Sequence, residues 1–321
     1  MSLTRRNFLS GAIAGAAAAS TIAGPAEARE AAALPPDALG LLFDSTLCIG
    51  CKACVTGCRN ANGTKPEFST EEKYWDTPLD ISGYTLTVIK MYSEGTGEAK
   101  DQEKNGFAFV KKSCLHCVDP SCVSVCPVSA MKKDPDTGIV SYDPDACIGC
   151  RYCVAACPFG VPRFQYDTAV PKISKCELCR HRLSEGKLPG CAEVCPTGAT
   201  LFGPVSALKA EADRRRALVP GELSTYPRQR VSSSDVHEKP AAKYVPHTYG
   251  ETEVGGTQML LLSGVPFDKM GYPDLPKKAF VSTSETIQHT LYKGLIAPAV
   301  LFSGLLYFAH KNSNHDDHGE E

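Results

Sequence analysis

The alternation of apolar and polar positions predicts strands and one helix between the cysteine-rich parts of the chain. Residues 85–92 (TLTVIKMY) and 107–112 (FAFVKK) alternate with the period of half-buried strands, and the Gly- and Lys-containing stretch between them suggests a hairpin. Residues 207–218 (ALKAEADRRRAL) have the spacing of an amphipathic helix. Its Arg214–Arg216 run is expected to form a solvated face.

Two further segments follow that helix. Residues 224–247 are rich in Pro and Ser, which predicts an extended arm lying on the surface or on a partner. The apolar run within residues 255–266 (GGTQMLLLSGVP) predicts a short buried strand. The single tryptophan, Trp75, is expected to be a packing anchor.

The N-terminus has the pattern of an export signal. Residues 1–28 contain an Arg pair, an Ala- and Gly-rich run and the A-x-A pattern Ala26-Glu27-Ala28. The stretch TRRNFL resembles the twin-arginine motif, which directs already folded proteins across the membrane. We therefore expect residues 1–28 to be a removable twin-arginine signal peptide.

The C-terminus has the pattern of a membrane anchor. Residues 290–309 carry one charge, Lys293, and a helix of that length reaches about 30 Å, which matches a hydrocarbon core. We expect a transmembrane helix there, with an amphipathic or buried helix as the alternative. Residues 310–321 are polar and predict a solvated tail.

Composition places the chain among globular proteins and against nucleic-acid binding. The 321 residues are 43% hydrophobic, as a packed core requires. Lys and Arg total 34 against 36 Asp and Glu, so the chain has no cationic excess with which to neutralise a phosphate backbone.

The cysteines change this picture, because all 16 fall into four groups of four. The groups are Cys48, Cys51, Cys54 and Cys58; Cys114, Cys117, Cys122 and Cys126; Cys147, Cys150, Cys153 and Cys157; and Cys176, Cys179, Cys191 and Cys195. Disulfides are the default for an exported chain, but thiols this crowded leave strained pairings. Structural zinc sites draw four ligands from two CxxC pairs, which leaves the third and fourth cysteines of each run unexplained.

The run CxxCxxCxxxCP at residues 147–158 is typical of a [4Fe-4S] cluster, and the other groups vary this pattern. Three cysteines bind one cluster, while the fourth binds the neighbouring cluster of a two-cluster ferredoxin. Proline follows the fourth cysteine at Pro127, Pro158 and Pro196, where it is expected to end a short helix, whereas Arg59 takes its place in the first group. His116, within CLHC, is expected to be a packing or polar neighbour of the cluster, because four thiolates already complete each set.

The four groups are related in pairs, which predicts two nested modules. LLFDSTLCIGC before the first group matches IVSYDPDACIGC before the third, and KKSCLHC at the second resembles ISKCELC at the fourth. The second and third groups stand in ferredoxin order, joined by a Gly-turned hairpin at residues 134–143, so they form an inner module. The first and fourth then form an outer module around it.

The expected fold is therefore α+β, with two ferredoxin-like two-cluster modules, one inserted in the other, and a C-terminal transmembrane helix. The outer module begins with residues 29–113 and is completed by 171–205, the inner module covers 114–170, an extended partner-binding region covers 206–283, and the anchor covers 290–309.

If each module behaves like a ferredoxin, its ligands cross over between its two groups. Cluster 1 then takes Cys48, Cys51, Cys54 and Cys195; cluster 2 takes Cys58, Cys176, Cys179 and Cys191; cluster 3 takes Cys114, Cys117, Cys122 and Cys157; and cluster 4 takes Cys126, Cys147, Cys150 and Cys153. Sequential pairing of the first group with the second is the alternative.

The chain resembles the four-cluster ferredoxin-like subunits of membrane oxidoreductases, and within them the hydrogenase-2 type electron-transfer subunits. The stretches that carry the resemblance are DSTLCIGCKACV, CVDPSCVSVCPVSAMKKDPDTGIVSYD, CIGCRYCVAACP, KCELC, LPGCAEVCPTGAT, GGTQ and IQHTLYKG. It implies a periplasmic relay that carries electrons between a nickel-iron hydrogenase pair and an integral membrane quinone-binding subunit.

The sequence itself also indicates an electron-transfer subunit that does not catalyse a reaction alone. It shows no phosphate-binding glycine loop, no HExxH motif and no cysteine left over for nickel or molybdenum. An equivalent subunit of a formate dehydrogenase, or of a molybdenum-dependent polysulfide, tetrathionate or nitrite reductase, is the alternative. Two other classes remain open at this stage: an enzyme that uses one cluster catalytically, and a structural protein with four zinc sites.

Overall fold

The computed structural model describes residues 32–68 and 77–313, and it divides into two units. One unit spans Ala31–Ala279 and contains all of the cysteines. The described part of the other is α8 (Phe280–Ser313), a single helix that contains Pro298. The predicted signal peptide at residues 1–28 and Trp75 lie outside the described residues, as does most of the predicted tail.

The predicted transmembrane anchor needs a correction. Residues 290–309 are helical, as expected, because they lie within α8. Among the residues that the structure describes, however, no helix has both the length and the apolar character required to cross a membrane. The expectation of a C-terminal transmembrane helix is therefore not supported.

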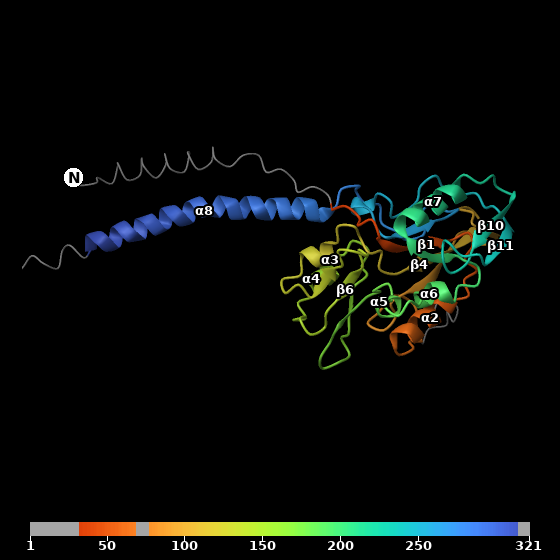
Figure 1. The fold of residues 1–321 in the computed structure, drawn as a ribbon, viewed down its shortest axis with the longest axis horizontal. Helices are drawn as coiled ribbons and strands as arrows, with labels where there is room; N and C mark the ends of the chain where they lie inside the picture. The colour runs from red at the N-terminus through yellow and green to blue at the C-terminus, as the bar shows by residue number, and fades with distance from the viewer. Residues whose placement is uncertain (1–31, 69–76, 314–321) are drawn as a thin grey trace, which may run out of the picture. The chain divides into compact units, whose positions relative to one another are not determined.

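The cysteine-containing unit (Figure 1) contains a three-stranded sheet that joins distant parts of the chain. Its middle strand β1 (Leu39–Asp44) pairs in parallel with β12 (Met259–Leu262) and antiparallel with β9 (Thr200–Pro204). All four residues of β12 are buried, which confirms the strand predicted within residues 255–266. A strand from the start of the unit thus pairs with one near its end.

Helix α7 (Val205–Arg216) confirms the helix predicted from residues 207–218 and packs on this sheet. Its Leu208 and Ala212 join a buried cluster with Leu42, Leu201 and Leu260 from the three strands. The apolar residues of the helix recur at a spacing of four, so they share one face, and that face meets the sheet.

The prediction that Arg214–Arg216 form a solvated face is wrong for Arg215. Arg215 has no exposed surface and forms ion pairs with Asp44 on β1 and Glu211 one turn earlier. The helix turns about 100° per residue, so three consecutive arginines cannot share a face, and the middle one points at the sheet.

The strands predicted at residues 85–92 and 107–112 are confirmed as β2 (Val88–Ser93) and β4 (Gly106–Lys112). They pair antiparallel, with the two-residue strand β3 (Ala99–Lys100) on the other side of β4. Residues 224–247, expected as an extended arm, contain a hairpin of β10 (Leu223–Pro227) and β11 (Val236–Pro240). Tyr226 of this hairpin is fully buried, so the segment packs on its own unit.

The hairpin predicted at residues 134–143 is confirmed by β5 (Met131–Lys133) and β6 (Val140–Tyr142), which pair antiparallel. A small core of its own lies here, with Met131, Val140 and Tyr142 packed against Cys122 and Cys153. The remaining short elements are α3 (Ser121–Ser124), α4 (Tyr152–Ala156), β7 (Arg163–Phe164), β8 (Ile173–Ser174), α5 (Arg180–Leu183), α6 (Gly190–Glu193) and η2 (Glu253–Gly255).

Candidate iron-sulfur sites

The CIGC segments of the first and third groups fold alike. Gly50 and Gly149 both have positive φ angles, of 70° and 73°, which a residue without a Cβ adopts at little cost. Lys52 and Arg151 follow in the left-handed region, and helices α2 (Ala53–Asn62) and α4 begin at the next residue. Two left-handed residues within so short a segment curl the backbone, so the successive thiols surround a common centre.

The proline after the fourth cysteine is preceded by a short helix, as predicted, but the helix stops before the fourth cysteine and does not carry it as expected. Helices α3, α4 and α6 end at Ser124, Ala156 and Glu193, one or two residues before the cysteine that precedes each proline. Helix α2 instead runs through Cys58 to Asn62, because Arg59 can continue a helix where proline would break it.

Two cavities are each lined by four cysteines. Cys48, Cys51, Cys54 and Cys195 surround one, together with apolar side chains that include Phe43 and Ile89. Cys126, Cys147, Cys150 and Cys153 surround the other, beside Met131 and Ile173. These groupings coincide with the sets predicted for clusters 1 and 4.

The other eight cysteines interact electrostatically in two further groups. Burial, followed by the neighbouring thiols of Cys176, Cys191 and Cys179, raises the pKa of Cys58 well above its usual value. Burial, followed by Cys114, Cys157 and Cys122, raises the pKa of Cys117 in the same way. These neighbours are the members of the sets predicted for clusters 2 and 3.

Thiols of adjacent sets also influence one another. Burial raises the pKa of Cys54 to about 11, and Cys191 contributes to this rise. Burial and then Cys114 raise the pKa of Cys176. Burial raises the pKa of Cys122 to about 12, with a contribution from Cys153. Each pair joins two predicted sets, so the sets are neighbours in the order 1, 2, 3 and 4.

The donor set fits an iron-sulfur cluster. Buried, mutually repelling thiols ionise only when a positive group takes up their charge, and the iron of a cluster does so. Backbone N–H groups already point at several sulfurs: Ala130 donates to Cys126 Sγ at 3.2 Å and Thr200 donates to Cys195 Sγ at 3.4 Å. Such bonds to sulfur help to set the reduction potential of a cluster.

Groups of three or more His, Cys, Asp or Glu side chains arranged to hold a single metal ion are not found in the described part of the chain. A cubane is larger than an ion, so its four thiolates stand around a cavity and not around a point.

His116 is buried next to the second group. Its Nδ1 accepts the backbone N–H of Val140 at 3.0 Å, and no partner for its Nε2 occurs within residues 32–68 and 77–313. Burial, followed by Lys175 and Lys133, holds the pKa of His116 well below its usual value, so the ring is neutral. The packing role expected for His116 is consistent with the bond to Nδ1.

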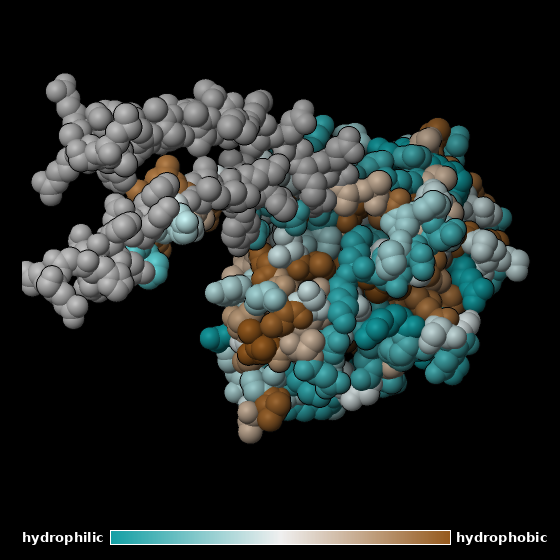
Figure 2. Space-filling model, turned by 60° about the vertical axis from the view of Figure 1, so that its left-hand side comes forward, coloured by the Kyte–Doolittle hydropathy of each residue, from teal (hydrophilic) through white to brown (hydrophobic). Residues whose placement is uncertain are grey.

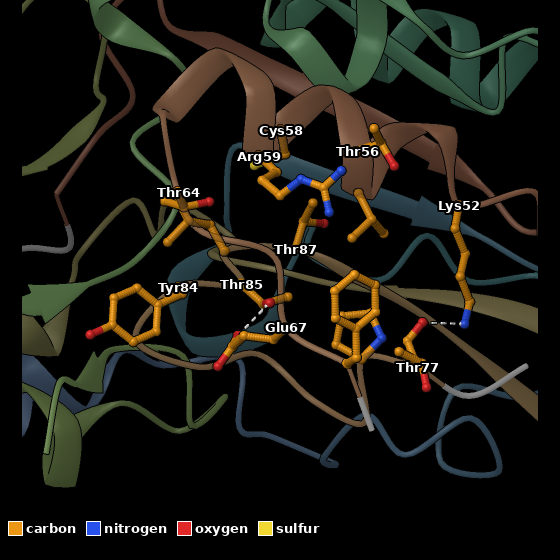
Figure 3. A pocket seen from close by; sticks show the side chains of 14 residues that line it. Lys52, Thr56, Cys58, Arg59, Thr64, Glu67, Thr77, Tyr84, Thr85 and Thr87 are labelled. Carbon is orange, nitrogen blue, oxygen red and sulfur yellow. Dashed lines mark hydrogen bonds between the residues drawn. The ribbon is translucent and has the colours of Figure 1, made fainter. Parts of the chain in front are cut away.

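A separate pocket of about 180 Å³ lies beside α2 (Figure 3). Arg59 of α2 and Lys52, the residue before this helix, face it, and Lys52 Nζ donates to the carbonyl of Thr77 at 2.7 Å. Glu67 accepts hydrogen bonds from the hydroxyls of Ser82 and Thr85. The carboxylate is therefore engaged by two hydroxyl groups.

Sequence reasoning did not identify Asn62 or Lys111 as neighbours of the sulfurs. Asn62 Nδ2 lies 3.6 Å from Cys58 Sγ and 3.9 Å from Cys179 Sγ. The sequence does contain a feature that could have identified Asn62: Arg59 stands where the other groups have proline, and it lets α2 continue by the turn that carries Asn62. Lys111 has no such signal, because only the fold brings β4 to the first and fourth groups.

Comparison with known proteins assigns the chain to a family. Residues 106–205 match the family model described as a 4Fe-4S dicluster domain, which confirms the expected cofactor. The chain is 48% identical over 322 residues to the hydrogenase-2 operon protein HybA of Escherichia coli O157:H7, covering 98% of each protein. It is 31% identical over 270 residues to the iron-sulfur subunit of the nitrate-inducible formate dehydrogenase of Escherichia coli K12, covering 83% of this chain and 82% of that subunit. The chain therefore belongs to the family of ferredoxin-like iron-sulfur electron-transfer subunits that includes HybA.

Proposed function

We propose that the protein is an electron relay of four [4Fe-4S] clusters, ligated by the four crossed sets predicted from the sequence. The observation that carries the proposal is the grouping of the sixteen cysteines, in which two cavities and two sets of interacting thiols each combine cysteines from two groups. The nested arrangement of an outer and an inner module follows from the same grouping.

The relay is linear, in the order of clusters 1, 2, 3 and 4. Three pairs of neighbouring thiols support this order: Cys54 with Cys191, Cys176 with Cys114, and Cys122 with Cys153. Cys51 and Cys150 are the two exposed cysteines among the sixteen, and they belong to the first and the last cluster. The two ends of the relay are therefore the places where electrons enter and leave.

The clusters supply one-electron chemistry, and the chain supplies their setting. The four thiols of each set hold a cluster, and apolar walls such as Phe43 and Ile89 limit the access of water to it. Backbone N–H groups donate to sulfur and stabilise the negative charge that a reduced cluster gains. None of these groups acts on a substrate.

The relay connects a nickel-iron hydrogenase with a membrane quinone-binding subunit on the periplasmic side. The similarity to HybA along nearly the whole chain supports this partner over the alternative, a formate dehydrogenase. Purification of the membrane complex through this chain tests the choice. We expect nickel in the complex and hydrogen-dependent quinone reduction that is lost when this subunit is absent, whereas molybdenum or tungsten would favour a formate dehydrogenase or a chalcogen reductase.

The crossed ligand sets are tested by serine substitutions at cysteines of one group. If Cys58 binds cluster 2, then Cys58→Ser and Cys179→Ser perturb the same paramagnetic signal, because both remove a ligand of that cluster. Cys51→Ser serves as the matched comparison and perturbs the signal of cluster 1. A Cys58→Ser spectrum that matched Cys51→Ser instead would mean that each group holds its own cluster. The parent protein is expected to contain about sixteen irons per chain.

Export by the twin-arginine route follows from residues 1–28, since that route carries folded proteins and a cluster can be inserted before transport. Replacement of Arg5 and Arg6 by Lys is expected to leave the protein in the cytoplasm with its clusters intact, as measured by cell fractionation and visible absorption. Normal export of the double variant would argue for another route.

A further inference from the structure

A buried lysine lies against the outer cysteine sets. Lys111, near the end of β4, is 1% exposed, whereas its neighbour Lys112 points to the opposite face and pairs with Asp80 at 2.9 Å. Lys111 Nζ lies 3.2 Å from Thr200 Oγ1, to which it donates a hydrogen bond. The backbone N–H of Thr200 in turn donates to Cys195 Sγ at 3.4 Å. Thr200 therefore contacts both the Lys111 ammonium and a proposed ligand of cluster 1.

The strongest electrostatic neighbours of Lys111 are thiols. Within residues 32–68 and 77–313, Lys111 forms no ion pair with Asp or Glu. Burial acts to lower its pKa, but Cys191, Cys54 and Cys195 outweigh burial and hold the pKa above its usual value. Cys54 and Cys195 belong to the set of cluster 1 and Cys191 belongs to that of cluster 2.

An uncompensated buried ammonium would cost several kcal/mol, so its place in the core needs a negative partner. A cubane held by four thiolates is that partner, because it carries net negative charge in both oxidation states and gains one more negative charge on reduction. The attraction to a fixed cation is therefore stronger for the reduced cluster, and a low-dielectric interior strengthens it further.

The internal repeat supplies a comparison within the same chain. KKSC at residues 111–114 corresponds to ISKC at residues 173–176, which places Ile173 where Lys111 stands. Ile173 lines the cavity of Cys126, Cys147, Cys150 and Cys153, and it is 4% exposed. At corresponding positions of the repeat, Lys111 thus places a cation beside the outer module, whereas Ile173 places an apolar side chain beside cluster 4.

We propose that the buried positive charge of Lys111 raises the reduction potentials of both cluster 1 and cluster 2, relative to a neutral residue at this position. In the step concerned, the oxidised cluster gains one electron from its reduced neighbour, and no bond or proton changes place. Because one ammonium acts on both clusters, it shifts both potentials in the same direction. This inference rests on the proposed ligand sets.

Potentiometric titration of the cluster-loaded full-length chain, followed by electron paramagnetic resonance, tests the role. Lys111→Met is expected to make reduction of clusters 1 and 2 at least tenfold less favourable, which is 59 mV for one electron. Clusters 3 and 4 are expected to shift by less than that. Lys111→Arg keeps the charge and is expected to retain the parent potentials, and Lys112→Met, on the exposed face of the same strand, is the matched control.

Iron analysis of every variant separates the possible failures. Full iron with unchanged potentials in Lys111→Met, or an equal shift of all four clusters, would overturn the tuning role while leaving the ligand sets intact. A parent chain with fewer than about four clusters would instead count against the proposed function. Lys111→Gln, which can keep the bond to Thr200, is the second neutral variant. Loss of iron from both neutral variants but not from Lys111→Arg would assign Lys111 to cluster assembly and also overturn the tuning role.

Discussion

At the scale of single residues, Arg215 holds the central sheet and α7 together through buried charges. Its Nη1 lies 2.9 Å from Asp44 Oδ2 and its Nε lies 2.7 Å from Glu211 Oε1, and both Arg215 and Asp44 are fully buried. The hydroxyl of Tyr244 also donates to Asp44 Oδ2 at 2.8 Å. Each buried charge is thus compensated, and loss of any one leaves its partner uncompensated.

Arg215→Met is expected to destabilise the protein by about 3–5 kcal/mol, because it leaves the Asp44 carboxylate buried without its cation. Arg216→Met is the matched control, since the Arg216–Asp213 pair is partly exposed to solvent and exposed pairs contribute about 0–1 kcal/mol. Thermal unfolding of the full chain, followed by circular dichroism, measures the difference. Adding Asp44→Asn to Arg215→Met should recover part of the loss, and equal unfolding temperatures for the two single variants would contradict the argument.

At the scale of elements, α2 and α6 come together at a contact that only glycine allows. A Cβ on Gly57 would lie 2.6 Å from the carbonyl oxygen of Gly190, and a Cβ on Gly190 would lie 2.6 Å from that of Gly57. Cys58 follows Gly57 and Cys191 follows Gly190, so the close approach of the two backbones brings together two proposed ligands of cluster 2.

Gly57→Ala is expected to separate the two helices and to release cluster 2, which lowers the iron content by about four of about sixteen atoms per chain. The methyl group has no room, because the atoms it meets include backbone oxygen. Thr56→Ala is the control, since this exposed neighbour on the same helix receives the same side chain. Iron analysis after purification measures the loss, and a Gly57→Ala protein with full iron would show that the contact does not hold the cluster.

The elements that were predicted correctly from the sequence are those determined by residues within or next to the element. Alternation identified β2 and β4, and the prolines that follow Cys126, Cys157 and Cys195 explain why three helices are short. The fate of Arg215 could not be predicted in the same way, because its partner Asp44 is 171 residues away in the sequence. The buried position of Lys111 also depends on pairings between distant segments, which a period-two pattern does not specify.

At the scale of the whole molecule, one side chain ties the end of the cysteine-containing unit to both of the proposed modules. Gln258 Nε2 donates to the carbonyl of Leu39 at 2.7 Å and to that of Thr137 at 2.8 Å. Its Oε1 accepts from Lys133 Nζ at 2.9 Å. Leu39 belongs to β1, whereas Lys133 and Thr137 belong to the inner hairpin, so the GGTQ stretch links the two modules through buried polar groups.

The surface of the same unit is uneven in polarity, and Figure 2 shows hydrophobic side chains gathered in patches between hydrophilic ones. Ile49 and Ile148, in the two CIGC segments, are 57% and 66% exposed. Each stands next to the proposed first or last cluster, near the exposed Cys51 or Cys150. Each end of the proposed relay thus has an exposed cysteine beside an exposed apolar side chain.

This difference between the ends and the middle of the relay predicts unequal reactivity toward oxidants. Titration of the isolated full-length chain with ferricyanide is expected to damage clusters 1 and 4 first, because Cys51 and Cys150 leave these clusters accessible, whereas the sets of clusters 2 and 3 contain no exposed cysteine. Electron paramagnetic resonance should show three-iron signals from two clusters while the other two remain reducible. Within the intact membrane complex, partners that cover the ends should slow this damage. Simultaneous loss of all four clusters in the isolated chain would contradict the linear order, because a relay whose two middle clusters have no exposed cysteine has to lose its ends first.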